Sequence, residues 1–197
     1  AWRGGVTGYR LVLVGIGVTA VLSAGTGYLL TQARIYEARE AMVWLTGSLN
    51  GRGWDHVRPL AVALAVLVPL ALALGRHLRM LELGDDSARG LGLAVERSRA
   101  ALLVVAVALA AIATAAAGPI GFVALVAPQI ARRLVHARTV ALLPSAAVGA
   151  LLMTAADLVG RRIFAPSELP VGIVTALLGA PYLLILLARA HRIGAAG

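Results

Sequence analysis

Few side chains in this sequence have the types and spacing that chemistry requires. Asp157 and Arg161 stand four residues apart, and on a helix that spacing places the carboxylate against the guanidinium. The interpretation we prefer is an ion pair at a helix end. An ionisable group bordering a membrane-length apolar stretch can instead be functional, and that alternative also covers Glu168, which lies just before Pro170.

Other reactive side chains are scattered or absent. The chain has no cysteine, which excludes a disulfide framework, a thiolate metal site and a cysteine nucleophile. Its four histidines fall in different polar segments, so we expect no metal site and no cofactor; they are His56, His77, His136 and His191. There is also no His-Glu-x-x-His, Gly-x-Ser-x-Gly or Walker A sequence. We therefore expect no enzyme, and any ATP hydrolysis would belong to another chain.

The composition of the chain indicates a membrane protein. Of the 197 residues, 60% are hydrophobic and 14% are charged, and the mean hydropathy is +0.88. Lipid must therefore cover much of the surface. All 18 basic residues are arginines, which give a net charge of +9 without forming a basic run, so we expect no nucleic-acid partner.

Five apolar stretches approach or exceed the roughly 20 residues that one bilayer crossing needs. They are Leu11–Ala33, Pro59–Gly75, Ala100–Ala131, Thr139–Ala156 and Leu169–Ala188. As one straight helix the third stretch would reach about 48 Å, which exceeds the thickness of a bilayer. It contains Gly118-Pro119-Ile120-Gly121, a pattern that interrupts helices. We predict a span, a turn and a return helix of about 15 residues; a re-entrant segment is the alternative.

The arginines favour the hairpin interpretation. Loops that face the cytoplasm carry an excess of positive charge. With the hairpin, twelve arginines fall on one side, and the six on the other are Arg34, Arg39, Arg52, Arg58, Arg161 and Arg162. Without it, the count is nine against nine. We therefore predict an all-α, polytopic transmembrane bundle of about six segments with both termini in the cytoplasm.

Two further features concern helices at the membrane interface and within the membrane. Ile35–Leu45 reads as a short amphipathic helix at the membrane interface, with Trp44 and Trp54 as anchors. Small residues in the first span, such as Gly15 and Gly17, indicate close helix packing, although they could line a substrate path.

The loop Arg76–Arg99 is long enough to hold structure of its own. Asp85, Asp86 and Ser87 are candidates for a helix N-cap, and Gly90 and Gly92 would end that helix after about a turn and a half. A second short helix could run from Ala94 to Arg99. Such a pair of helices would form a docking surface for a cytoplasmic partner; a solvated connector is the alternative.

The run from Gly118 to Arg132 resembles the FecCD-type permease family of bacterial ABC importers for iron-siderophores, haem and cobalamin. The resemblance continues through Leu142-Leu143-Pro144, Ala156-Asp157 and the run from Glu168 to Pro181, and covers roughly Tyr9 to Arg189. Its motif residues are Gly118, Pro119, Gly121, Pro128, Gln129, Arg132, Glu168, Pro170, Gly172, Gly179 and Pro181. Gln129 departs from the pattern, since the family more often has His there.

The resemblance implies a fold, partners and site residues. Such permeases usually have ten helices, so residues 1–197 would form a single transmembrane permease domain, the C-terminal six-helix portion. Arg161 matches a position that docks an extracytoplasmic substrate-binding lipoprotein. The family's ATPase-coupling region matches Asp86, Ser87, Ala88, Arg89, Gly90 and Gly92.

The function that the resemblance implies is uptake of ferric-siderophore complexes through the bacterial inner or plasma membrane. The permease would pair with a second permease subunit, as a homodimer or heterodimer, and would be powered by cytoplasmic ABC ATPase subunits. Haem or cobalamin are alternative substrates in the same family. An ion-coupled secondary transporter is a rival, but it would need a buried acid near mid-membrane, and no charged residue lies within the five apolar stretches. An intramembrane enzyme is a further rival, which would need a paired nucleophile and base.

Overall fold

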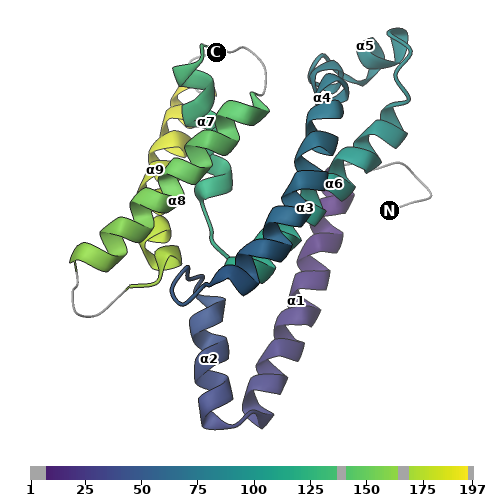
Figure 1. The fold of residues 1–197 in the computed structure, drawn as a ribbon. Helices are drawn as coiled ribbons and strands as arrows, with labels where there is room; N and C mark the ends of the chain where they lie inside the picture. The colour runs from purple at the N-terminus through teal and green to yellow at the C-terminus, as the bar shows by residue number, and fades with distance from the viewer. Residues whose placement is uncertain (1–7, 137–140, 164–168, 195–197) are drawn as a thin grey trace. The chain divides into compact units, whose positions relative to one another are not determined.

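The computed structural model describes residues 8–136, 141–163 and 169–194, and within these ranges all regular secondary structure is helical (Figure 1). This confirms the all-α prediction. The helices are α1 (Gly8–Gln32), α2 (Ile35–Leu45), α3 (Trp54–Ala73), α4 (Gly75–Glu82), α5 (Asp85–Gly90), α6 (Val95–Ala117), α7 (Val123–Leu134), α8 (Leu142–Ile163) and α9 (Val171–Gly194).

Four of these helices, α1, α3, α6 and α8, are long and apolar enough to cross a membrane. Helix α9 has 24 residues, of which Val171–Tyr182 is an apolar stretch. Helix α7 has 12 residues and would rise only about 18 Å, which is too short for a full crossing. The six predicted segments therefore correspond to these six helices.

The predicted interruption of the third stretch is confirmed. Helix α6 ends at Ala117, Gly118 has a φ of 80°, and α7 begins only at Val123. Gly118 can adopt this φ without strain because it has no Cβ, and Pro119 has no N–H to continue the helix. The return helix is shorter than predicted.

The fourth apolar stretch ends at Ala156, and α8 continues past it to Ile163, as the predicted ion pair between Asp157 and Arg161 at a helix end requires. Arginine is a good helix former, and Arg161 and Arg162 in the last turn lie where the helix dipole favours positive charge. The polar end of α8 is thus helical rather than part of a loop.

The short helices agree with prediction only in part. Helix α2 has the predicted bounds. In the loop Arg76–Arg99, the second short helix expected at Ala94–Arg99 is wrong, because these residues open the long helix α6, which begins at Val95. Nothing after Arg99 interrupts a helix, and alanines follow it. The companion of α5 is instead α4, which precedes it.

The chain divides into two compact units, which we describe separately. The first unit comprises residues 1–42 and 61–112, and the second comprises residues 43–60 and 113–197. In the second unit α7 packs on α8 and α8 on α9 (Figure 1). Its core is formed by Ala156, Val171 and Val174, with Leu49, Ile120, Met153 and Leu169 packed around them.

The first unit buries little of itself. No residue of α1 between Val12 and Gln32 is buried, and α3 has no buried residue. The buried positions of this unit gather at α5 and along one face of α6, where Val95, Ser98 and Val105 recur at helical spacing. Among the described residues, the tight packing of the first unit is therefore concentrated in α5 and the first three turns of α6.

Candidate functional site

Helix α5 is bracketed by two glycines whose backbone conformation other residues rarely adopt. Gly84 precedes it with a φ of 95°, and Gly92 follows it with a φ of 83°. At the second joint, Gly92 N–H donates to Arg89 O at 2.9 Å and Leu93 N–H donates to Ala88 O at 3.0 Å. This pair of bonds is a Schellman motif, which ends a helix. The residue after the helix end takes a positive φ in this motif, and glycine adopts that conformation without strain. Gly92 therefore terminates α5, as predicted.

The start of α5 differs from prediction. Asp85, Asp86 and Ser87 were candidate N-caps, but the N-cap residue is Gly84, and no side chain caps the helix. Asp85 and Asp86 instead lie in the first turn of α5, where the helix dipole favours negative charge. Their carboxylates are then available for arginines.

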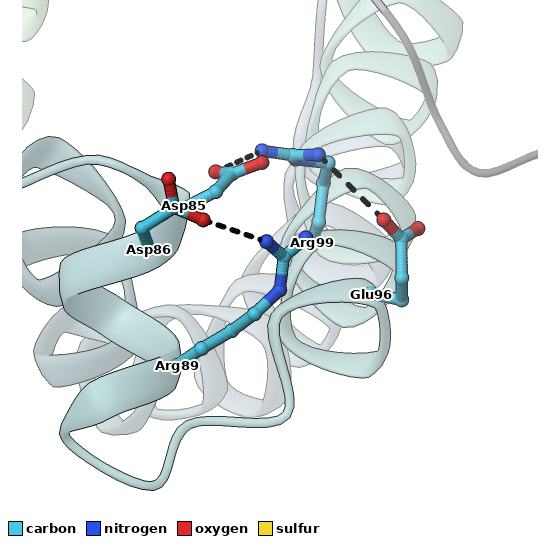
Figure 2. Close-up of polar contacts among 5 residues, drawn as sticks. All are labelled: Asp85, Asp86, Arg89, Glu96 and Arg99. Carbon is cyan, nitrogen blue, oxygen red and sulfur yellow. Dashed lines mark hydrogen bonds and ion pairs between the residues drawn. The ribbon is translucent and has the colours of Figure 1, made fainter.

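Three ion pairs surround this turn (Figure 2). Asp85 Oδ1 lies 2.8 Å from a guanidinium nitrogen of Arg99, and this pair joins α5 to α6 across 14 residues of chain. Asp86 pairs with Arg89 at 3.0 Å within α5, and Glu96 lies 3.9 Å from Arg99 within α6. Arg99 is thus held by a carboxylate of each helix, as Figure 2 shows.

The residues predicted to couple to an ATPase have unequal exposure. Ala88 is fully buried, whereas Ser87, Arg89, Gly90 and Gly92 are exposed and the Asp86 side chain is fully open to solvent. Two exposed apolar side chains flank them, with Leu83 at 64% and Leu91 at 60% exposure. The arrangement can present an apolar and charged surface on a short helix, with Ala88 supporting it from beneath.

A second candidate region is a junction of backbone segments in the second unit. Ser48 N–H donates to Ala117 O at 2.8 Å, and Gly172 N–H donates to Gly47 O at 3.0 Å. The loop between α2 and α3 thereby joins the end of α6 to the start of α9. A Cβ added to Gly118 would collide with Trp44 O. One added to Gly172 would likewise collide with Thr46 O, so only glycine permits these approaches.

A third close approach lies further along α9. A Cβ added to Gly179 would collide with the Phe122 side chain, and Phe122 itself has a φ of 67°, which is rare for a non-glycine residue. Both residues line a cavity of about 150 Å³ between α7, α8 and α9, together with Tyr182 and Thr175. The lining is almost wholly apolar, so it offers no constellation for catalysis.

The ion pair predicted at the end of α8 is confirmed. Arg161 Nε lies 2.8 Å from Asp157 Oδ2, and the Arg161 side chain is 42% exposed. The guanidinium is therefore both oriented and accessible, which suits a group that meets a carboxylate on another protein.

The remaining motif residues lie apart from one another. Pro128 and Gln129 lie partly buried in α7, Arg132 is exposed in its last turn, and Gly121 is exposed before it. Pro170 immediately precedes α9, and Pro181 lies inside it. Glu168 is outside the described residues.

Two residues of these regions were missed by sequence reasoning. Gly47 makes the junction with Gly172, and only the turn pattern Thr-Gly-Ser hinted at it. Arg99 was counted as a charge, although its neighbour Glu96 and the acidic pair Asp85-Asp86 were visible partners. Within the ranges that the structure describes, no three His, Asp or Glu side chains gather as a metal site.

The sequence of this chain is similar to those of a known family of permeases. The sequence model of the FecCD transport family matches residues 1–189. The ferric enterobactin transport system permease protein of Escherichia coli strain K12 is 47% identical over 98% of this chain and 58% of its own length. The iron(3+)-hydroxamate import system permease protein of Bacillus subtilis strain 168 is 43% identical over 97% of this chain and 57% of its own length.

A solved structure is also similar. It is described as an inward-facing conformation of a metal-chelate type ABC transporter, with a TM-score of 0.84 and 29% identity over 93% of this chain and 60% of that chain. The chain therefore spans somewhat more than half the length of the relatives that it matches.

Proposed function

Because the chain belongs to the FecCD transport family, we propose that it is the C-terminal six-helix portion of a membrane permease that imports ferric-siderophore complexes. Its energy would come from separate ATPase subunits in the cytoplasm. The observation that carries the proposal is helix α5: a short helix between two glycine joints, joined by an ion pair to the start of a membrane-length helix, with charged and apolar side chains exposed. Such an element can receive a force from another protein.

The mechanism follows from how α5 is attached. Asp86, Arg89, Leu83 and Leu91 would contact the ATPase subunit, whose closure on ATP would displace α5. Since α5 leads directly into α6 and is joined to it by the ion pair between Asp85 and Arg99, the displacement would reach the membrane spans. Alternation between outward-open and inward-open states requires a bistable element of this kind.

Two further partners belong to the proposal. A substrate-binding lipoprotein on the opposite side of the membrane would dock through Arg161, because an accessible guanidinium can hold a carboxylate with two hydrogen bonds. A second permease subunit would complete the path between the two-fold related copies. In this arrangement both termini and α5 lie on the cytoplasmic side, as the arginine distribution predicts.

The substrate class is tested by uptake. We would express the full-length system in a strain that lacks its own permease of this family, and measure uptake of ferric enterobactin-type and hydroxamate-type chelates, haem and cobalamin. The proposal expects accumulation of iron chelates that depends on the permease. Accumulation of haem or cobalamin alone would reassign the substrate.

The coupling role of α5 is tested by Ala88→Arg. Ala88 is fully buried, so a long cation there must push α5 away from its support, and ATP-driven uptake should fall at least about tenfold while the protein still inserts into the membrane. The matched control is Ala94→Arg, which puts the same side chain at an exposed position of the same loop and should retain most uptake. Normal uptake by Ala88→Arg would contradict the coupling assignment.

A further inference from the structure

The ion pair between Asp85 and Arg99 joins α5 to α6. Neither residue is among those proposed above to contact the ATPase subunit. Asp85 is the first residue of α5, and Arg99 lies in the second turn of α6. Their polar atoms are 2.8 Å apart, and their side chains are 40% and 30% exposed, so the pair is partly shielded from solvent. Partial shielding strengthens an ion pair relative to one fully in water.

The glycines at the two ends of α5 could let this helix rotate without moving α6 when the ATPase subunit pushes on it. A helix of six residues is not stable by itself, and both of its ends are attached through glycines in left-handed conformations. Glycine has little steric resistance to rotation about φ and ψ. A push on α5 could therefore be absorbed at Gly84 and Gly92 instead of moving α6.

The contacts around Arg99 oppose such a rotation. The pair of Asp86 with Arg89 lies within α5 and cannot attach that helix to α6. The pair of Glu96 with Arg99, at 3.9 Å, lies within α6 and likewise does not attach the two helices to each other (Figure 2). Asp85 and Arg99 then connect the two helices on the side of the Gly84 joint, while Ala88 is buried in the middle of α5.

We propose that Arg99 is a positioning residue for energy coupling: by holding Asp85, it prevents α5 from pivoting on its glycine joints, so that α5 and α6 move as one body. This rests on the proposed function of α5 as the element that receives the force. Arg99 does not contact the ATPase in this assignment. It acts through Asp85.

The first test measures ATP hydrolysed per chelate imported, in proteoliposomes that contain the full-length permease, its ATPase and its binding protein. For Arg99→Gln we expect this ratio to rise about fivefold, which is the factor expected from loss of a partly exposed ion pair. Asp85→Asn should give the same rise. The double variant should be no worse than either single variant, and additive losses would overturn the proposal.

Two variants serve as controls. Arg99→Lys keeps a cation at the position and should restore much of the wild-type ratio. Arg97→Gln removes an exposed arginine two residues earlier on α6 and should leave the ratio unchanged. A rise with Arg97→Gln equal to that with Arg99→Gln would show that general positive charge, not the pair, matters.

A second measurement reports the position of α5 directly. These 197 residues contain no cysteine, so spin labels at Ser87→Cys on α5 and Val104→Cys on α6 have no competing site within them, and any cysteine elsewhere in the full-length permease is first replaced by serine; both labelled positions are exposed. The distance distribution between the labels should be narrow with Arg99, broad with Arg99→Gln and narrow again with Arg99→Lys. An unchanged narrow distribution in Arg99→Gln would overturn the proposal even if uptake fell.

The failure of this proposal is distinguishable from the failure of the proposed function. If Ala88→Arg leaves uptake intact, α5 does not couple at all and the role of Arg99 falls with it. If Ala88→Arg abolishes uptake while Arg99→Gln keeps the wild-type ratio, α5 couples without this ion pair.

Discussion

The two units of this chain differ in how much of each is buried and in which contacts hold it together. The second unit builds a core of small side chains, Ala156, Val171 and Val174, and joins distant segments through backbone contacts at Gly47 and Gly172. In the first unit, Val12–Gln32 of α1 and all of α3 contain no buried residue, and the buried positions lie in α5 and the first three turns of α6. Apolar helices of the first unit must therefore be covered by lipid or by other protein.

This difference assigns the two units different roles. Backbone contacts that exclude any Cβ cannot slide without being lost, so the second unit is suited to move as a rigid body. The first unit has its charged pairs and glycine joints where another chain could act on it. The predictions below test this contrast, beginning with the largest effect.

The largest effect is expected for Gly172→Ala in the second unit. The added Cβ would collide with Thr46 O, and the backbone must shift to accept it, which should cost about 3 kcal/mol or more. The measurement is the temperature at which half of the full-length detergent-solubilised protein aggregates. Gly17→Ala in α1 is the matched control, because its Cβ meets nothing within 4 Å, and it should be neutral or stabilising by about 0.5–1 kcal/mol. Equal destabilisation by both would remove the contrast between the units.

A smaller effect is expected for Gly179→Ala, whose Cβ would collide with the side chain of Phe122. Because Phe122 can give way in part, we expect a loss of about 1–3 kcal/mol in the same thermal assay. Phe122→Gly removes the opposing Cβ and relieves the positive φ, so Gly179→Ala should cost less in that background. Independent, additive losses would show that the two residues do not share this contact.

The smallest effect on stability is expected for Arg161→Gln. The ion pair with Asp157 is one helical turn long and partly exposed, so its loss should change stability by about 0.5 kcal/mol or less. Binding of the substrate-binding protein to the full-length permease should nevertheless weaken, and wild-type binding should weaken with added salt. Asp157→Asn is the control, since it removes the pair but keeps the guanidinium. Unchanged affinity and salt dependence in Arg161→Gln would rule out this docking contact.

Local sequence signals predicted local structure well. Gly118-Pro119 marked the end of α6, the alternation of charge and aromatic residues marked α2, and the spacing of Asp157 and Arg161 marked their ion pair. Each depends on residues within one or two turns. The start of the helix in the Arg76–Arg99 loop was less predictable. The N-cap residue of α5 is Gly84, and the acidic residues that were candidate N-caps lie in the first turn instead.

Long-range contacts could not be predicted in the same way. Gly47 and Gly172 are hydrogen-bonded although they lie 172 − 47 = 125 residues apart in the sequence. Neither residue has a side chain from which its partner could be predicted. Arg99 had several carboxylates within reach in the sequence, and only folding selects Asp85 and Glu96. Which candidate-site residues act together is therefore a property of the fold.

The most direct test of the proposed function is to ask which energy source drives uptake. Proteoliposomes that contain the full-length permease, its ATPase and its binding protein would be loaded with ATP, or with a non-hydrolysable analogue, and uptake of a ferric siderophore would be measured with and without a proton gradient. We predict accumulation that requires ATP hydrolysis and persists when the gradient is collapsed. Accumulation that needs no ATPase and disappears with the gradient would contradict the proposal and identify an ion-coupled transporter.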